Sequence, residues 1–390
     1  MTSLLRSQLR SLRACRPLHC ARHTSSTPPR DIPPLPPHDE WRATFNTTMG
    51  AVRDRISVAN PDTADILAKA FLTGNSIAAG QGKTVIECYP GPGALSRGLL
   101  RLDDKTLERL IILEDWEPYL EYLRPLEQAD PRVTVVPLSG FSWSTYAHIE
   151  EKGLLDHIKT VPYEQGMHPQ LHFVSHIPQN ISGEQFVAQL FRNIPTHSWL
   201  FKYGCVPMSF IMGEWIWERV AALRKTIPRC KVSVITEATA DMQAAVRPSV
   251  LQPYAQHLHP RPTSQQLKKP ESRRIGHPLA AINTVPYAEQ VIAPHLLDAW
   301  DYCLRKLFVL KSTPLNKAIS ALGPGADSLL RVLTAKDLPP EQRVDVTQRV
   351  RDMSVSDWAL LIRAFDNWPF APENLVISDA FLEDRRDRSL

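Results

Sequence analysis

The sequence lacks the long apolar run that a membrane-spanning helix requires. No stretch of about 18 consecutive apolar residues occurs in its 390 residues, so a transmembrane helix is not expected. Cysteine is also scarce, with six residues that show no paired short spacing after the first 35 positions. This scarcity argues against a disulfide scaffold or a zinc site and favours a reducing compartment. We therefore expect no membrane insertion and no metal.

A strong net charge is absent as well. The chain has 45 lysines and arginines against 41 aspartates and glutamates, which gives a formal net charge of +4. This balance permits nucleic-acid binding without requiring it, because phosphate contacts depend on basic residues that cluster locally. The distribution of charge is therefore more informative than the total.

The first thirty residues contain no aspartate or glutamate. Six arginines fall in this stretch, and Leu4, Leu5, Leu9 and Leu12 can share one helix face opposite several of them. Such a cationic amphipathic segment is typical of a mitochondrial transit peptide, and a disordered basic tail is the alternative. A proline-rich stretch follows. We assign residues 1–35 to a targeting peptide and linker, and we expect the protein in the mitochondrial matrix.

Strands and helices alternate through the first two-thirds of the chain. Helices are predicted at 61–71, 94–102 and 119–126, with Asn60 as the cap of the first. This alternation predicts an α/β fold with a mostly parallel sheet and crossover connections. The predicted strands are 83–88, 110–113, 133–136, 171–174, 199–203 and 231–236.

The pattern changes twice after this alternation. We place the α/β domain at residues 40–250 and interpret 251–292, part of which is rich in proline, glutamine and histidine, as a loop or linker. Apolar residues at helical spacing then predict a small helical domain at 293–375, followed by a tail at 376–390.

Two loops at the carboxyl ends of predicted strands have the features of a nucleoside site. The first covers residues 87–93, where glycines let the backbone approach a ligand closely. The second begins at Glu114, whose carboxylate can hold ribose hydroxyls, although a solvated acid at a strand end is the alternative. A phosphate-binding loop at 80–84 is excluded, because that motif needs a glycine where this chain has Ile77 and must follow a strand.

Four segments of the chain match one known pattern. They are a glycine-containing loop at 85–96, an acidic strand end at 112–115, a polar segment at 173–182 and a helical signature at 349–358. Together they resemble the rRNA adenine dimethyltransferase family, and within it the mitochondrial transcription factor B branch. The resemblance implies a Rossmann-like S-adenosylmethionine-dependent methyltransferase fold with a small C-terminal helical domain.

The catalytic segment departs from the family pattern. The family's Asn-Leu-Pro-Tyr corresponds here to His176, Ile177, Pro178 and Gln179. In the family, the Asn side chain and a backbone carbonyl accept hydrogen bonds from the target adenine, and the Tyr stacks on the flipped base. A histidine has a different reach, and Gln179 has no face for stacking, an interaction worth about 1–3 kcal/mol per base. We therefore expect no intact catalytic residue and no methyl transfer.

The positions that the resemblance assigns to the cofactor are also altered. Tyr89 replaces the family's first loop glycine, Ser139 replaces an aspartate that binds the adenine amino group, and residues 57–59 replace an Asn-Phe-Leu segment. Glu87 is retained, but a carboxylate there can simply hold loop amides, so its presence is weak evidence for cofactor binding. We therefore expect binding of S-adenosylmethionine to be weak or lost. The cofactor positions are Glu87, Tyr89, Gly91, Gly93, Glu114 and Ser139.

The transcription factor B resemblance implies another use of the fold. It predicts an initiation factor that assists the mitochondrial RNA polymerase in recognising and melting promoter DNA, through backbone electrostatics and base stacking. Trp143, Trp215, Trp217 and Trp300 are candidates for stacking, with burial in the core as the alternative. The candidate nucleic-acid contacts are Arg261, Lys268, Lys269, Arg273, Arg274, Arg305, Lys306, Lys311 and Lys317.

Two other functions are compatible with the same fold, which cannot choose among them. One is an active mitochondrial rRNA adenine N6-dimethyltransferase, against which His176 and Gln179 argue. The other is a non-catalytic mitoribosome assembly factor or subunit. For the initiation factor we expect a monomer whose partners are the mitochondrial RNA polymerase and promoter DNA or RNA.

Overall fold

The computed structural model of the chain describes residues 31–50, 52–72, 82–264 and 275–375. Nearly all of the predicted targeting segment and the whole tail at 376–390 lie outside the described residues. Among the helices that are described, none is long and apolar enough to cross a membrane.

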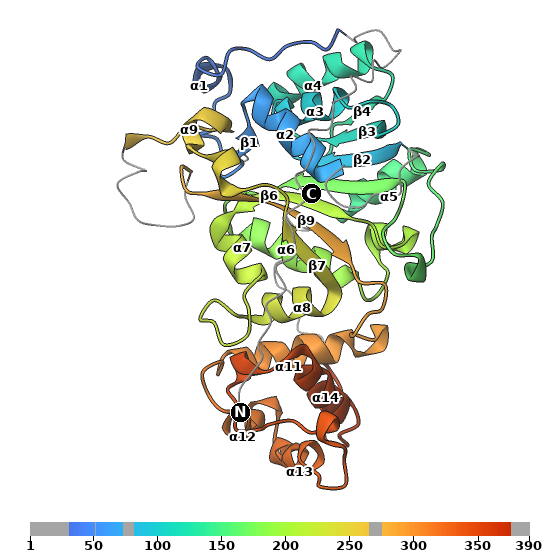
Figure 1. Ribbon diagram of the computed structural model, residues 1–390, viewed down its shortest axis with the longest axis vertical. Helices are drawn as coiled ribbons and strands as arrows, with labels where there is room; N and C mark the ends of the chain where they lie inside the picture. Colours follow the sequence, from blue (N-terminus) through green and yellow to red (C-terminus); the bar gives the residue numbers. More distant parts are fainter. Residues whose placement is uncertain (1–30, 51, 73–81, 265–274, 376–390) are drawn as a thin grey trace, which may run out of the picture. The chain divides into compact units, whose positions relative to one another are not determined.

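A seven-stranded sheet in the order β4-β3-β2-β5-β6-β9-β7 organises the residues before the helical region (Figure 1). The first five of these strands run parallel, whereas β9 is antiparallel to both β6 and β7. The predicted α/β arrangement with crossovers is confirmed. The strands are β2 (Lys83–Cys88), β3 (Leu107–Leu113), β4 (Val133–Val136), β5 (Leu171–His176), β6 (Met208–Gly213), β7 (Ala240–Ala244) and β9 (Leu279–Pro286).

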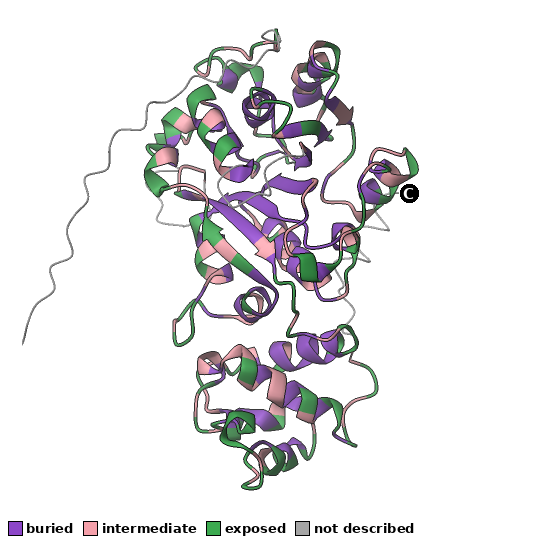
Figure 2. Cartoon of the chain, turned by 45° about the vertical axis from the view of Figure 1, so that its right-hand side comes forward, coloured by how far each residue is buried: buried purple, intermediate pink, exposed green. Residues whose placement is uncertain are grey.

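Helices cover both faces of this sheet. Strand β2 is buried along its whole length, with Val85 in the core on one face and Ile86 in the core on the other. Buried residues accordingly concentrate in the central strands (Figure 2). One face packs against α2 (Pro61–Leu72), α3 (Ala94–Leu100) and α4 (Glu117–Ala129), and the other against α5 (Trp143–Glu151), α6 (Ile181–Asn193), α7 (Glu214–Val220) and α8 (Lys231–Thr239).

Asn60 caps α2 as predicted. Its side-chain oxygen accepts hydrogen bonds from the backbone N–H groups of Asp62 (2.9 Å) and Thr63 (3.1 Å). These two groups have no partner inside the helix, so the cap fixes where α2 begins.

Two of the later predicted strands are wrong. Residues 199–203 form a 3-10 helix, η2 (Trp199–Tyr203), and residues 231–236 belong to helix α8. The β-branched residues Val232, Val234 and Ile235 favour a strand locally, but Cys230 and Ser233 form a capping box that starts a helix. The strand of this region is β6 instead.

The segment predicted as a loop or linker, residues 251–292, contains regular structure. Strand β8 (Leu258–His259) pairs with β1 (Ser57–Val58), and β9 lies inside the main sheet between β6 and β7. The prediction is therefore corrected for these positions. The other elements near this segment are η3 (Pro248–Leu251) and α9 (Tyr254–His257).

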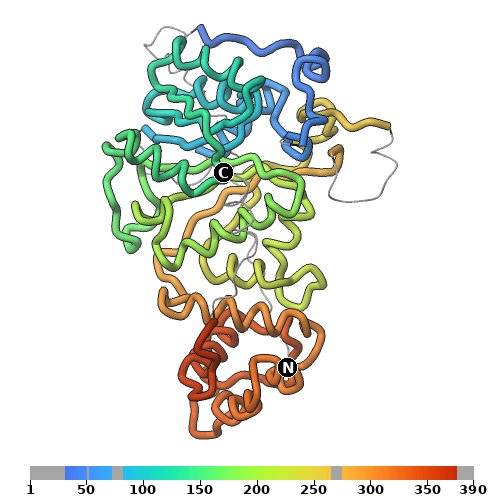
Figure 3. The backbone as a smooth tube through the Cα atoms, turned by 180° about the vertical axis from the view of Figure 1, so that it is seen from behind, coloured from blue at the N-terminus to red at the C-terminus, as the bar shows by residue number. Residues whose placement is uncertain are grey.

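The chain is helical from η4 (Pro294–Leu296) onward (Figure 3). Trp300, Trp358 and Phe365 are buried on the faces that the apolar spacing indicated, and Ser354 with Asp357 forms a capping box. The main helices are α11 (Leu297–Phe308), α12 (Leu315–Ala318), α13 (Leu329–Leu333) and α14 (Val355–Asp366). The short elements of the chain are α1 (Trp41–Thr44), η1 (Tyr163–Gln165), η5 (Ile319–Leu322), η6 (Ala326–Ser328), η7 (Pro340–Gln342) and η8 (Val350–Asp352).

Lys83, the first residue of β2, is a charged side chain placed in the interior. It is 1% exposed, and its Nζ has no hydrogen-bond partner among the described residues. Burial lowers the pKa of Lys83 from 10.5 to about 8. At pH 7 the protonated lysine therefore costs folding about 3 kcal/mol, because one pKa unit corresponds to about 1.4 kcal/mol.

Replacing Lys83 by methionine should stabilise the protein at pH 7 by up to about 3 kcal/mol. The folded chain binds fewer protons at this site than the unfolded chain, so the wild-type cost is full below pH 8 and disappears as pH rises toward 10.5. Denaturant unfolding at pH 7 and pH 10 measures this difference. Lys105→Met, at an exposed position, is the matched control. A less stable Lys83→Met variant at pH 7 would contradict the expectation.

Candidate functional site

Residues 54–57, called here the capping segment, cross the carboxyl ends of the central strands. The backbone N–H of Gln179 donates to the Asp54 carbonyl (2.7 Å), and the His176 Nδ1 lies 3.3 Å from the Ile56 carbonyl. Asn180 caps α6 and also donates to the Asp54 carboxylate (3.2 Å). The chain thus covers its own catalytic-like segment.

Arg55 of the capping segment binds the carboxylate of Glu114, the group that the sequence predicted to hold ribose hydroxyls. Its guanidinium forms ion pairs with Glu114 at the end of β3 and with Asp115 (3.1 Å). The other Glu114 oxygen accepts hydrogen bonds from the backbone N–H groups of Asp115 and Trp116, at 3.0 Å each. Glu114 is fully buried, so it is not a solvated strand-end acid, and both of its oxygens have partners inside the chain.

Tyr89 fills the space between the ends of β2 and β4. Its ring lies 3.8 Å from the Arg55 guanidinium carbon and 4.6 Å from the Phe141 ring, measured to ring centroids. The phenol hydrogen-bonds the Ser139 hydroxyl (2.5 Å) and donates to Asp115 (3.2 Å). Burial, with a contribution from the Asp115 charge, raises the pKa of Tyr89, which stays protonated. The predicted adenine-binding position, Ser139, is therefore occupied by the chain itself.

The two loop glycines are required by packing within the chain. Gly91 has a φ of +67°, and a Cβ there would lie 2.6 Å from the Ser57 Cβ. Gly93 has a φ of +89°, and a Cβ there would lie 2.5 Å from a Leu123 methyl carbon. The close approach that the sequence predicted is real, but the approaching groups are side chains of this protein.

Glu87 binds a side chain of α3 instead of the loop amides. One carboxylate oxygen accepts a hydrogen bond from the Ser96 hydroxyl (2.6 Å). The other lies 3.8 Å from the His176 Nε2, and neither of these two atoms has a hydrogen-bond partner among the described residues. Both side chains are buried. The deepest part of the site is therefore polar and closed to solvent.

Gln179 is turned into the protein. Its side-chain oxygen accepts a hydrogen bond from the Trp215 Nε1 (3.0 Å), and the same oxygen would lie 2.3 Å from a Cβ at Gly213. Asn180, the nearest amide, is held in the α6 cap, and Trp215 is 6% exposed. Neither one restores the amide and the aromatic face of the family's catalytic segment.

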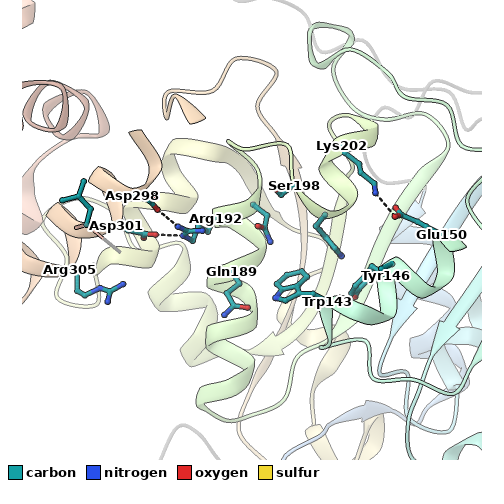
Figure 4. A pocket seen from close by; sticks show the side chains of 14 residues that line it. Trp143, Tyr146, Glu150, Gln189, Arg192, Ser198, Lys202, Asp298, Asp301 and Arg305 are labelled. Atoms are coloured by element: carbon teal, nitrogen blue, oxygen red, sulfur yellow. Dashed lines mark hydrogen bonds and ion pairs between the residues drawn. The ribbon is translucent and has the colours of Figure 1, made fainter. Parts of the chain in front are cut away.

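Aromatic side chains connect Tyr89 through Phe141 and Phe186 to Trp143. Trp143 lines a separate cavity of about 560 Å³ (Figure 4). Phe141 stacks on Phe186 (centroids 4.0 Å apart), and Trp143 lies 6.1 Å from Phe186. Of the tryptophans predicted to stack on bases, Trp143 lines this cavity, Trp217 is half-buried, and Trp215 and Trp300 are buried. The cavity is lined by Trp143, Tyr146, Ala147, Glu150, Gln189, Arg192, Asn193, Ser198, Trp199, Lys202, Asp298, Asp301, Arg305 and Leu375.

Charged residues of this cavity are paired with one another. Arg192 on α6 forms ion pairs with Asp298 (2.9 Å) and Asp301 on α11, and Lys202 pairs with Glu150 (2.7 Å). Figure 4 shows these pairs on two sides of the cavity, with Trp143 between them. The cavity therefore lies where α5, α6 and α11 meet, and Glu114 is not among its lining residues.

Five of the predicted nucleic-acid contacts lie in the described part of the chain, and their surroundings differ. Arg305 lines the cavity, Lys306 lies 5.4 Å from the Tyr302 ring, and Lys311 donates to the Ile227 carbonyl (2.9 Å). Lys317 is exposed on α12. Arg261 is exposed and follows β8, where its charge acts on His38 and His259. Lys268, Lys269, Arg273 and Arg274 lie outside the described residues.

The described part of the chain shows no group of three or more His, Cys, Asp or Glu residues that could hold a metal ion. The residues that sequence reasoning missed are Arg55 and Phe141. Arg55 contacts Glu114 across 59 positions of sequence, so no local pattern could reveal it. The only signal was its position next to residues 57–59, where the chain departs from the family.

Removing Arg55 should destabilise the fold by about 3–5 kcal/mol at about pH 9, where an ionised Glu114 would be buried without its cation. Burial already raises the pKa of Glu114 to about 7 against the opposing charge of Arg55, and loss of the guanidinium raises it further. The deficit of Arg55→Ala should therefore be largest above pH 7 and shrink as pH falls to 7 and below, because the folded variant takes up a proton on Glu114 above pH 7. Thermal unfolding at several pH values measures it.

The double variant Arg55→Ala/Glu114→Gln should recover part of the loss, since no charge then stays unpaired. Arg101→Ala, which breaks an exposed ion pair with Asp65, is the matched control and should cost under about 1 kcal/mol. Equal losses in Arg55→Ala and Arg101→Ala would show that the Arg55 pair is not the main support of this segment.

Comparisons with known proteins agree with this architecture. Among curated proteins, the chain is 24% identical over 295 residues to mitochondrial transcription factor 1 of Lachancea kluyveri, covering 74% of this chain and 82% of that protein. It is 24% identical over 319 residues to the Saccharomyces cerevisiae protein of the same name, covering 75% and 82%. It is also 22% identical over 323 residues to the mitochondrial dimethyladenosine transferase 1 of Vermamoeba vermiformis, covering 75% and 84%.

Solved structures with a similar arrangement include the 23S rRNA methyltransferase ErmE, with a TM-score of 0.47 and 14% identity over 80% of this chain and 100% of that one. A dimethyladenosine transferase from Plasmodium falciparum has a TM-score of 0.48 and 15% identity over 79% and 97% of the two chains. A family model described as ribosomal RNA adenine dimethylase matches residues 59–365, from just before α2 into α14. This family match and the seven-stranded sheet confirm the Rossmann-like methyltransferase fold, and the chain belongs to the ribosomal RNA adenine dimethylase family.

Proposed function

We propose that this protein is a mitochondrial transcription initiation factor that assists the mitochondrial RNA polymerase in promoter recognition and melting, and that it transfers no methyl group. The observation that carries this proposal is the occupation of the cofactor site by Arg55 and Tyr89. The similarity to proteins named mitochondrial transcription factor 1 supports the proposed role in transcription initiation.

S-adenosylmethionine does not fit the site as the residues are arranged. Both Glu114 oxygens are engaged by the chain, so ribose hydroxyls would have to displace Arg55 from a buried ion pair. The Tyr89 ring fills the position of the family's first loop glycine, and its phenol hydrogen-bonds the Ser139 hydroxyl, the group expected to contact the cofactor's adenine. Entry of the cofactor would cost the loss of a buried charge pair, which is worth several kcal/mol. We infer that the residual affinity is negligible.

The catalytic-like segment points to the same conclusion. Gln179 is hydrogen-bonded to Trp215, and His176 lies against the capping segment. Neither side chain is available to a flipped adenine, so a bound base would meet no stacking face and no amide acceptor. Without a cofactor and without a base pocket, the fold keeps only its capacity to bind other macromolecules.

Binding of a nucleic acid would rely on the basic residues of the helical region. Lys306 and Lys317 are exposed there, and Arg305 is half-buried at the cavity. Such residues hold phosphates, and Trp143 in the cavity supplies an aromatic face for an unpaired base. This combination suits separated promoter strands. We place the activity in the mitochondrial matrix, in keeping with the cationic segment before residue 31.

Calorimetric titration tests the occupied site directly. We expect no detectable binding of S-adenosylmethionine to the wild-type chain and measurable binding to Arg55→Ala/Tyr89→Gly, because this variant frees Glu114 and restores the family's glycine at a positive φ. Tyr89→Phe keeps the ring and serves as the control without binding. Tight binding by the wild-type chain would overturn the occupied-site argument.

Run-off transcription with the cognate mitochondrial RNA polymerase tests the positive half of the proposal. The expected result is promoter-dependent transcript that requires this chain, together with no methyl incorporation into small-subunit rRNA. Methylated rRNA would favour the dimethyltransferase function instead. Co-sedimentation with ribosomal subunits, without any transcript, would favour the mitoribosome function.

A further inference from the structure

Three aliphatic side chains stand almost fully exposed near the end of α11. Leu223 and Ile227, in the loop between α7 and α8, are each 74% exposed, and Val309, directly after α11, is 82% exposed. The Lys311 Nζ donates to the Ile227 carbonyl (2.9 Å), which joins the two segments. Figures 1 and 3 show the loop beside the end of α11 from opposite sides. We call Leu223, Ile227 and Val309 the aliphatic patch.

The loop that carries the patch is held firmly by the helices behind it. Arg229 is fully buried and donates to the carbonyls of Ala222 (3.0 Å) and Met353 (3.3 Å). The Arg224 Nε donates to the Asp352 carbonyl (3.0 Å). The backbone of the loop is therefore ordered before any partner arrives, which removes an entropic cost from binding.

Basic residues border the patch, and acidic residues are absent from the two segments that form it. Residues 222–236 and 302–326 contain no aspartate or glutamate. Arg224 and Lys225 are exposed, and Lys311 is half-buried beside Ile227. Charge complementarity therefore favours a partner with carboxylates around its contact area.

We propose that the aliphatic patch is a docking surface for an acidic protein partner, whose surface combines a shallow apolar depression with surrounding carboxylates. This inference rests on the proposed function, under which the partner is the cognate mitochondrial RNA polymerase. Leu223, Ile227 and Val309 leave water when such a partner covers them, and the surrounding cations orient it. Nucleic-acid phosphates would satisfy the cations and leave the aliphatic side chains in water, so a protein fits the surface better.

The test measures binding of the full chain to purified cognate polymerase without DNA. Leu223→Asp/Ile227→Asp should weaken binding at least about tenfold, because it places carboxylates against an acidic partner. Lys225→Glu should weaken binding less, with a loss that diminishes as salt rises. Both variants change exposed side chains, so thermal unfolding should match the wild-type chain.

The matched control is Val332→Asp, an exposed aliphatic residue on α13 that lies outside the patch and is 55% exposed. It should bind the polymerase as the wild-type chain does. Unchanged binding by Leu223→Asp/Ile227→Asp overturns the proposal. So does a loss shared equally with Val332→Asp.

Other occupants of the patch give distinct results, each of which overturns the proposal. A second copy of this chain would appear as a dimer in sedimentation velocity that the double variant dissociates. Nucleic acid or a membrane would appear as variant-sensitive binding to promoter DNA or to anionic phospholipid vesicles, with polymerase binding unchanged.

The failure of the patch is distinguishable from the failure of the proposed function. If the wild-type chain binds polymerase and supports run-off transcription while the double variant does the same, only the docking surface is wrong. If the wild-type chain neither binds polymerase nor supports transcription, the proposed function is wrong and the docking surface falls with it.

Discussion

The buried pair of Arg55 and Glu114 ties the segment before α2 to the centre of the sheet. Two charges withdrawn from water are tolerated only where each has its partner in place, so the pair fixes the path of residues 54–57. That path brings Asp54 and Ile56 onto the catalytic-like segment and Ser57 onto Gly91. One ion pair thus links the segment before α2 to the strand ends and to the residues around them.

This region turns features of a ligand site into parts of the fold. The Glu114 carboxylate accepts hydrogen bonds from the chain itself, and residue 89 has the positive φ that favours glycine although it is a tyrosine. Tyr89 closes the arrangement by packing between Arg55 and Phe141. The outline of a cofactor motif in the sequence is therefore compatible with a site whose polar groups have partners within the chain.

Much of the fold could be predicted because the central strands are short apolar runs bounded by turn residues. The run at Lys83–Cys88 and the cap at Asn60 are local signals, and both are confirmed. Strand β9 was missed because Leu279–Pro286 mixes alanine, asparagine and threonine, and its burial depends on strands far away in sequence. Helix α8 was misread because its β-branched residues favour a strand unless the capping box is considered.

The sequence could predict which residues lie at the strand ends, but not which side chains of the same chain contact them. Glu87, Tyr89, Glu114 and Ser139 do lie close to the strand ends, because parallel strands bring their carboxyl ends to one edge. What occupies that edge could not be inferred, since Arg55 reaches it across dozens of residues. The different surroundings of Arg305, Lys306 and Lys311 show the same limit for surface charge.

The position of β9 has a consequence for how the chain is built during synthesis. Among the described residues, strand β7 pairs with β9 alone, and the edge of β6 that faces away from β5 has no partner but β9. Until residues 279–286 leave the ribosome, two strands made earlier have open hydrogen-bonding edges, and such edges invite contact with other chains. The nascent protein thus completes its sheet only when this late strand has been made. A chaperone that covers the edges of β6 and β7 until then would prevent their association with other chains.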